Sequence, residues 1–261
     1  MLIDTHCHLF VPALRDGLDM VLARARDAGI EKIIVPALNP ETANSAVELA
    51  DAYEEVYFAV GYHPSEVDES TSLDEIAKII ESFKGHKKLV AIGEIGLDFR
   101  HRRYAKTLAS AIESAQIRVF SFQVDLAEEL NLPIIIHNRD AGKEIISVLS
   151  AHPDSFGVFH AFDGSKKILE FLKSRNFFVS IAGNITYRGA DALRACLKLI
   201  PEDRLLLETD APFMAPEPFR GQTSEPCHLR LVLSKVAEVL AKSEESIIIL
   251  TSGNSYRLFR F

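Results

Sequence analysis

Eight short apolar runs, rich in β-branched residues, recur along the chain and are separated by segments with helical periodicity. The runs cover residues 2–5, 32–38, 56–63, 89–98, 133–138, 157–162, 177–183 and 205–210. Several are apolar at consecutive positions, which is typical of strands buried on both faces of a parallel sheet. The eightfold alternation therefore predicts an α/β fold, a (β/α)8 TIM barrel. An open doubly wound sheet stays the alternative, because alternation alone does not establish closure.

The segments between the runs contain helix start and stop residues. Asn39 precedes Pro40 in the arrangement of a helix N-cap, and Ser72 with Glu75 has the spacing of a capping box. Gly29 stands where the first long helix would end. The later helices are expected at residues 104–130, 143–150, 166–175, 189–199, 227–241 and 244–258.

The alternation runs through residues 1–261, which predicts one domain. The proline-rich stretch 211–226 is interpreted as a long loop after the last strand, because only about one helix pair follows it, too little for a second core. Hydrophobic residues make up 48% and charged residues 25%, which excludes a disordered chain. No apolar stretch approaches the ~20 residues of a membrane span. With no evident secretory signal and three scattered cysteines, we expect a cytoplasmic protein.

Histidines and acidic residues gather where the predicted strands end. In a parallel barrel all strands point the same way, so side chains at their carboxyl ends converge on one rim. Each candidate taken alone has a structural or surface role as its ordinary explanation, but their coincidence at strand ends predicts a metal centre. The candidates are His6, His8, His63, Glu94, His137, His160 and Asp210.

The arrangement of these candidates favours two metal ions. Strand period two places His6 and His8 on one face, where two imidazoles can chelate one ion. Glu94 lies inside an apolar strand, where an unpaired carboxylate costs several kcal/mol and therefore needs a cation or donors. Six ligands exceed the about three of a catalytic zinc. We expect one ion at His6, His8 and Asp210, a second at His137 and His160, and Glu94 shared between them.

Seven short motifs resemble those of the TatD family of metal-dependent deoxyribonucleases. They are IDTHCH at 3–8, VGYHP at 60–64, GEIGLD at 93–98, LPIIIH at 132–137, HAF at 160–162, ETDAP at 208–212 and NSYRLF at 254–259. The resemblance implies an amidohydrolase-type TIM barrel and a nuclease activity. By position, the family's metal ligands fall on His6, His8, Glu94, His137, His160 and Asp210. Asp163 and Ser224 depart from the family's pattern in presumed rim loops, which bears on substrate preference and not on the ligands.

The expected reaction is cleavage of a DNA phosphodiester bond by a water activated by two metals. Glu94, Asp210 and His63 are the predicted catalytic residues: Asp210 accepts the proton of the water, and His63 contacts the phosphate or positions the leaving group. Four imidazoles favour zinc or another transition ion, whereas phosphodiester chemistry and the resemblance favour magnesium or manganese.

A chain with a formal charge of −8 needs local cations to bind a nucleic acid. Two divalent ions leave the centre at about +1, and arginines near the rim add to this. The predicted phosphate contacts are Arg100, Arg102, Arg103, Arg139 and Arg220, and the aromatic residues considered for base stacking are Tyr62, Phe99, Tyr104 and Tyr187.

Two other functions remain open at this point. The same metals would serve a hydrolase of a carbonyl ester, amide or lactone, including a D-aminoacyl-tRNA deacylase, because metals polarise carbonyl and phosphoryl groups alike. A metal-stabilised scaffold without catalysis is the other. No membrane association and no obligate protein partner is expected.

Overall fold

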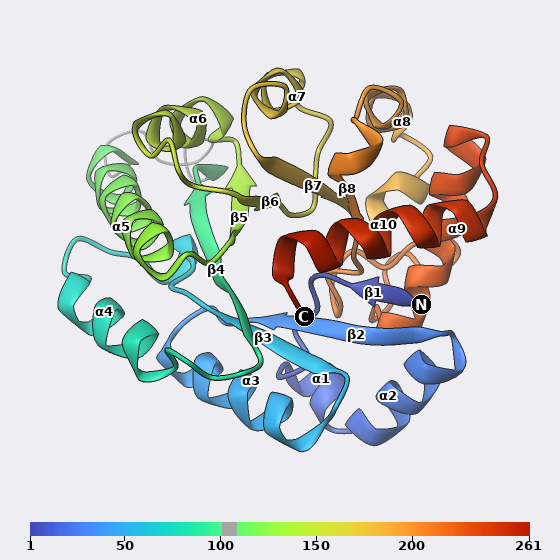
Figure 1. Cartoon of the computed structure of the whole chain (residues 1–261), viewed down its shortest axis with the longest axis horizontal. Helices are drawn as coiled ribbons and strands as arrows, with labels where there is room; N and C mark the ends of the chain where they lie inside the picture. Colours follow the sequence, from blue (N-terminus) through green and yellow to red (C-terminus); the bar gives the residue numbers. More distant parts are fainter. Residues whose placement is uncertain (101–108) are drawn as a thin grey trace.

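The computed structural model of the chain describes residues 1–100 and 109–261. Eight parallel strands form one sheet in sequence order and are surrounded by helices (Figure 1). Each of the eight apolar runs overlaps one strand. The strands are β1 (Leu2–Asp4), β2 (Ile30–Pro36), β3 (Val56–Val60), β4 (Leu89–Asp98), β5 (Ile134–Arg139), β6 (Gly157–Phe159), β7 (Phe177–Ile181) and β8 (Leu205–Leu207).

The first and last strands are joined just beyond β1 and β8. The amide of Thr5 donates to the carbonyl of Leu207 at 3.2 Å, and the amide of His8 donates to the carbonyl of Ala211 at 2.7 Å. These bonds close the ring, so the open-sheet alternative is wrong and the (β/α)8 TIM barrel is confirmed.

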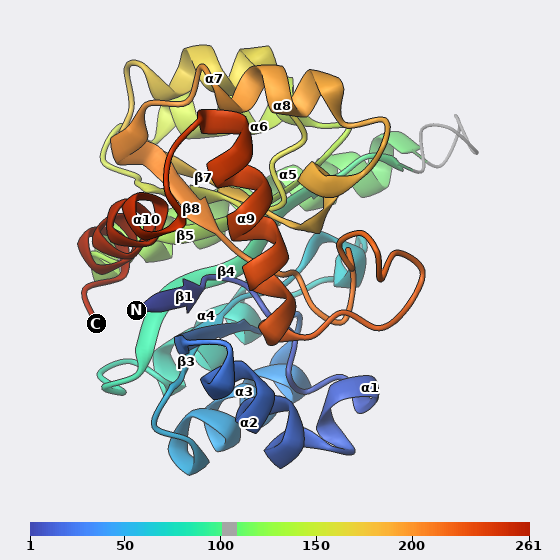
Figure 2. The same cartoon turned by 90° about the vertical axis from the view of Figure 1, so that its right-hand side faces the viewer.

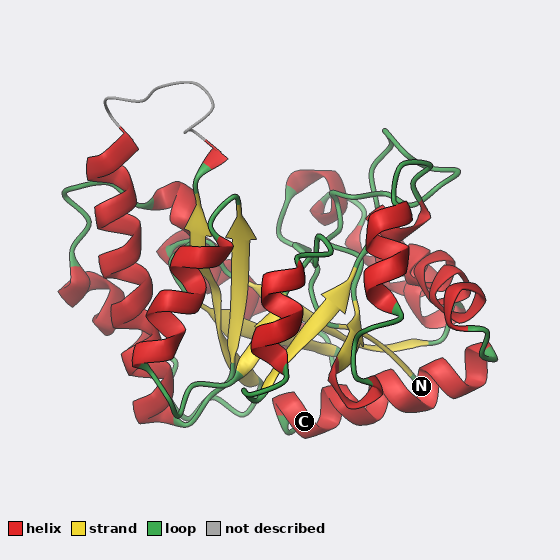
Figure 3. Cartoon of the chain, turned by 90° about the horizontal axis from the view of Figure 1, so that it is seen from above, coloured by secondary structure: helices red, strands yellow, loops and turns green. Residues whose placement is uncertain are grey.

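Helices cover the outside of the barrel, as Figure 3 shows with helices in red and strands in yellow. The predicted caps are confirmed: the Asn39 side chain accepts from the amide of Thr42, and the Ser72 hydroxyl accepts from the amide of Glu75. The helices are α1 (Pro12–Arg15), α2 (Leu18–Asp27), α3 (Pro40–Ala52), α4 (Leu73–Ser82), α5 (Ala109–Leu130), α6 (Gly142–Ala151), α7 (Lys166–Leu172), α8 (Asp191–Leu197), α9 (Leu229–Leu240) and α10 (Glu244–Phe259). Short 3-10 turns are η1 (Pro64–Glu66), η3 (Gly183–Thr186), η4 (Glu202–Arg204) and η5 (Pro226–His228). No helix in the described ranges is long and apolar enough to cross a membrane.

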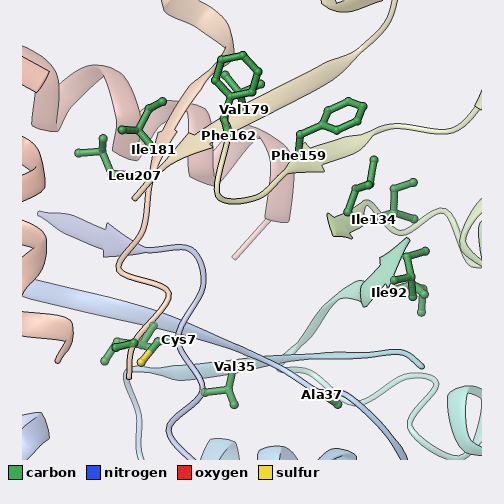
Figure 4. Close-up of a cluster of buried hydrophobic side chains, with 14 of the residues drawn as sticks. Cys7, Val35, Ala37, Ile92, Ile134, Phe159, Phe162, Val179, Ile181 and Leu207 are labelled. Atoms are coloured by element: carbon green, nitrogen blue, oxygen red, sulfur yellow. The ribbon is translucent and has the colours of Figure 1, made fainter. Parts of the chain in front are cut away.

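The strands bury both faces, as their consecutive apolar residues predicted. One face packs with the helices, and Figure 4 shows part of this core, including Val35, Ile92 and Phe159. The other face forms a second cluster with the end of α10, made of Ile34, Ala59, Val90, Ala91, Ile135, Val158, Phe178, Leu206, Leu258 and Phe259.

Helix α10 covers the end of the barrel where the strands begin. The Asn254 amide nitrogen donates to the carbonyls of Glu202 and Leu205, each at 2.8 Å, which holds the helix at the start of β8 (Figure 2). Apolar packing therefore fills that end, and the opposite rim is left for polar chemistry.

Candidate metal centre

The predicted metal-binding residues meet at the carboxyl rim of the barrel, but most lie beyond the strands and not within them. Only Glu94 in β4 and His137 in β5 belong to strands. Six of the predicted runs were too long at their carboxyl ends, namely 2–5, 32–38, 56–63, 157–162, 177–183 and 205–210. In two of them the backbone turns away from the strand conformation because Ala161 and Asp210 adopt left-handed conformations with φ of 45° and 55°.

A glycine two residues after Glu94 allows β4 and β5 to approach closely. Gly96 has a φ of +144°, and a Cβ at this position would lie 2.0 Å from the carbonyl oxygen of His137. Only glycine fits this contact, which brings the Glu94 carboxylate beside the His137 imidazole.

One oxygen of Glu94 faces a first group of donors formed by His6, His8 and Asp210. The two imidazole Nε2 atoms lie 3.2 Å apart, and Glu94 Oε2 lies 3.3 Å from that of His6 and 3.7 Å from that of His8. Asp210 Oδ1 lies 3.7 Å from His6 Nε2 and 3.5 Å from His8 Nε2. Donors about 2.0–2.2 Å from one ion in a tetrahedral arrangement are about 3.3–3.6 Å apart. The spacing of this group therefore fits a metal ion.

The other oxygen of Glu94 faces a second group of imidazoles. Glu94 Oε1 lies 2.7 Å from His137 Nδ1 and 2.8 Å from His160 Nε2, and these two nitrogens are 3.3 Å apart. His63 Nε2 lies 3.4 Å from the same oxygen. The two oxygens of one carboxylate thus serve two separate sets of nitrogen donors.

His63 differs from the other histidines in how its ring is held. Its Nδ1 accepts from the backbone amide of Ser65 at 3.0 Å and lies 2.7 Å from the Ser65 hydroxyl. A neutral imidazole that accepts at Nδ1 carries its proton at Nε2. His63 therefore presents an N–H donor toward Glu94, which is a hydrogen-bonding role and not that of a ligand through this atom.

The centre is buried and its charges are coupled. Burial alone would raise the pKa of Glu94, but the imidazoles of His160, His63 and His6 outweigh it and hold that pKa well below its usual range. Burial opposes ionisation of Asp210 as well, yet the hydrogen bond from His8 and the charge of His6 keep its pKa low. Both carboxylates are therefore ionised at neutral pH.

The opposite shift occurs at His160. Burial would lower its pKa, but Glu94 and the hydrogen bond to Glu208 outweigh it and hold the pKa of His160 well above its usual range. The imidazole of His160 lies between the carboxylates of Glu94 and Glu208, which together favour a positive charge there.

Glu208 was not among the predicted site residues. It is 1% exposed, its Oε1 accepts from the amide of Ala161 at 2.6 Å, and the same atom lies 3.5 Å from His160 Nδ1. A carboxylate directly after three leucines, two residues before Asp210, is the sequence feature that could have identified it.

Two further aspartates brace the centre. The Asp98 carboxylate lies 3.5 Å from His137 Nε2 and accepts from the amide of Arg100. Burial alone would raise the pKa of Asp98, but the hydrogen bonds with His137 and Arg100 outweigh it and lower that pKa to about 2. Asp4 is fully buried and accepts from Thr209 and from the amide of His6, and burial raises its pKa to about 7. Both aspartates hold backbone or side chains of the residues that surround the centre.

The residues present fit divalent metal ions. Two groups of three side chains place one donor atom each within 4.8 Å of one another: His6 with His8 and Glu94, and His6 with His160 and Glu208. A third group of this spacing, His63 with Glu94 and His137, includes the His63 ring that has a hydrogen-bonding role. Imidazole and carboxylate donors at this density are typical of transition-metal sites.

The predicted phosphate-binding arginines are dispersed around the rim. Arg100 is exposed, and Arg139 Nη1 lies 4.0 Å from Asp98 Oδ2. The Arg220 guanidinium stacks on the ring of Tyr187 at 4.3 Å. Arg102 and Arg103 lie outside the described residues, as does Tyr104.

A family model described as TatD related DNase matches residues 3–260. The chain belongs to the TatD family. The match confirms the resemblance seen in the seven sequence motifs, and it extends over nearly the whole length of the chain.

Relatives of known name support the same membership. The metal-dependent hydrolase YabD of Bacillus subtilis is 37% identical over 262 residues, covering 100% of this chain and 99% of the relative. The 3'-5' ssDNA/RNA exonuclease TatD of Cronobacter sakazakii is 35% identical over 250 residues, covering 92% and 91%. The crystal structure of the TatD homologue YjjV from Escherichia coli K12 superposes with a TM-score of 0.90 at 31% identity, covering 100% and 98% of the two chains. The chain is thus a member of a family of metal-dependent hydrolases.

Proposed function

We propose that this protein is a deoxyribonuclease that uses two divalent metal ions to hydrolyse phosphodiester bonds. The observation that carries the proposal is that the two carboxylate oxygens of Glu94 face different histidines. Its Oε2 lies 3.3 Å from His6 Nε2, and its Oε1 lies 2.7 Å from His137 Nδ1. A carboxylate with donors on both oxygens suits a pair of ions roughly 3.5–4 Å apart. The family model is described as a DNase, and one relative is named as an exonuclease of single-stranded DNA and RNA; both names support DNA as the substrate.

The two ions would be held by different histidines. His6, His8 and Asp210 with Glu94 Oε2 would hold one, and His137 and His160 with Glu94 Oε1 would hold the other. Magnesium, manganese and zinc are the candidates. When bound, such ions supply Lewis-acid stabilisation of the charge that develops on the phosphoryl group.

The protein's own residues provide the proton transfer and the orientation. The ionised Asp210 accepts the proton of the attacking water. His63 donates its Nε2 proton to a phosphate oxygen or to the leaving group, and Ser65 keeps its ring in that orientation. We assign phosphate contacts to Arg139, which ends β5, and to Arg220, in the loop after β8. Burial of Glu94 and Asp210 limits the screening of their charges by solvent.

A nuclease time course tests this function. The holoprotein, stripped of metal and reloaded with Mg²⁺, Mn²⁺ or Zn²⁺, is incubated with end-labelled single-stranded DNA and, in parallel, with a panel of esters, amides and lactones. Asp210→Asn should abolish DNA cleavage while leaving the fold intact by circular dichroism. Glu170→Gln, at an exposed carboxylate on α7, is the matched control and should cleave like the wild type.

Two results would contradict the proposal. Turnover of a carbonyl substrate without DNA cleavage would assign the centre to the ester, amide or lactone class. Wild-type DNA cleavage by Asp210→Asn would remove Asp210 from the proton transfer.

A further inference from the structure

An exposed phenylalanine stands beside the metal centre. Phe213 is 55% exposed, and its ring centroid lies 5.8 Å from that of His8 at an interplanar angle of 70°. The other large hydrophobic residues that are exposed in the described parts of the chain lie before β1, on helices or just after a helix: Met1, Met20 on α2, Leu199 after α8, and Ile249 and Tyr256 on α10. Phe213 thus leaves an aromatic face in solvent at the one place where substrate must arrive.

The backbone around Phe213 is fixed from several sides. Its amide donates to the carbonyl of Asp210 at 2.8 Å, and the carbonyl of Pro212 accepts from the amide of Ser224 at 2.9 Å. A Cβ on Gly183 would lie 1.9 Å from the carbonyl oxygen of Met214, so this loop lies directly on the loop after β7. The exposed ring is therefore presented by a held segment, which limits the conformational entropy lost on binding.

The aromatic residues predicted for base stacking are less suited to that role. Phe99 is fully buried, so this prediction was wrong for it. Tyr62 packs against the core, and one face of Tyr187 is covered by the Arg220 guanidinium. Phe10 also packs against the His8 ring, with centroids 5.6 Å apart, but it is only partly exposed. Within residues 1–100 and 109–261, Phe213 is therefore the most exposed phenylalanine in ring contact with a predicted metal ligand.

The chemistry of this position selects its ligand. A phosphate would be drawn to the cationic centre, whereas the uncharged ring of Phe213 offers only an apolar π-face. In a nucleic acid, the base is the aromatic group that lies near each phosphate, and its π-face can stack on the ring of Phe213. Stacking of this kind tolerates every base, because each has such a face.

Resting on the proposed function, we propose that Phe213 is a stacking platform for the nucleobase next to the phosphodiester that is cleaved. The subsite accepts an unpaired base, since a base within a duplex is already stacked on both sides. It thereby favours single-stranded over double-stranded substrate without selecting a base sequence.

The test compares Phe213→Ala with wild type on two oligonucleotides that differ by one base. One is an end-labelled single strand, and the other carries a tetrahydrofuran abasic residue next to the cleaved bond. We expect Phe213→Ala to lower kcat/KM on the normal strand about 5- to 150-fold, mainly through KM. On the abasic strand, the variant and the wild type should react alike. Phe213→Trp should retain wild-type activity.

Controls separate stacking from a structural defect. Ile249→Ala removes a similarly exposed side chain on α10 and should leave both rates unchanged. Metal content and circular dichroism should be unaltered in Phe213→Ala. Equal kcat/KM for Phe213→Ala and wild type on the normal strand overturns the platform, and so does an equal loss on both strands. These outcomes require wild-type DNA cleavage, and a wild type that cleaves no DNA contradicts the proposed function itself.

Discussion

Replacing Glu94 by glutamine should disrupt both metal sites at once. The amide has the shape of the carboxylate and can still hydrogen bond, so no cavity forms and the barrel should fold. It lacks the negative charge, however, and it cannot accept on both terminal atoms. Glu94 is 2% exposed and each of its oxygens lies within 3.4 Å of an imidazole nitrogen from a different group, so solvent does not compensate for the loss.

The size of the effect follows from these contacts. Altering a group that only supports a metal ligand costs 10- to 100-fold in metal affinity, and Glu94 is placed as a ligand itself. Each ion should therefore bind at least about 100-fold more weakly, which is about 2.7 kcal/mol per ion. At free metal ten times the wild-type Kd, each site of the variant would be about one-tenth occupied, so turnover, which needs both ions, should fall at least about 100-fold.

Metal analysis after dialysis, calorimetric metal titration and the nuclease time course measure these quantities. Glu170→Gln controls for the loss of one carboxylate. By contrast, a single histidine substitution such as His8→Ala should weaken one ion only. A Glu94→Gln protein that keeps two tightly bound ions and the wild-type rate would refute the shared-carboxylate reasoning, and one that loses a single ion would show that its two oxygens do not serve separate ions.

Three further predictions follow from the same geometry. Glu208→Gln should weaken the metal held by His160 about 10- to 100-fold, because Glu208 lies 3.5 Å from His160 Nδ1; calorimetric titration measures this, and an unchanged affinity would exclude the orienting role. His63→Ala should lower kcat about 10²- to 10⁴-fold with metal content unchanged, and loss of metal from this variant would instead make His63 a ligand. Chelation should lower the thermal unfolding temperature, since free metal at 100 times its Kd stabilises the folded state by about 2.7 kcal/mol; differential scanning calorimetry with added chelator and then with Mn²⁺ or Zn²⁺ checks this, and an unshifted transition would contradict it.

The sequence by itself determined the alternation of strands and helices and the identity of the gathered side chains, whereas closure into a barrel was decided by the hydrogen bonds that join the ends of β1 and β8. Buried strands and amphipathic helices are recorded in local apolar patterns, and the caps at Asn39 and Ser72 are encoded within a few residues. Because parallel strands all end at one rim, positions such as His6, Glu94 and His160 could be expected together before any coordinates.

Tertiary structure decided where the strands end and which atoms meet. The left-handed conformation of Asp210 and the direction of each Glu94 oxygen are set by contacts between strands distant in sequence. The same holds for aromatic residues: Phe99 and Phe213 both follow a strand, β4 and β8, yet Phe99 is buried and Phe213 is exposed. Side-chain direction follows backbone dihedral angles and packing partners, and these exist only once the ring has closed.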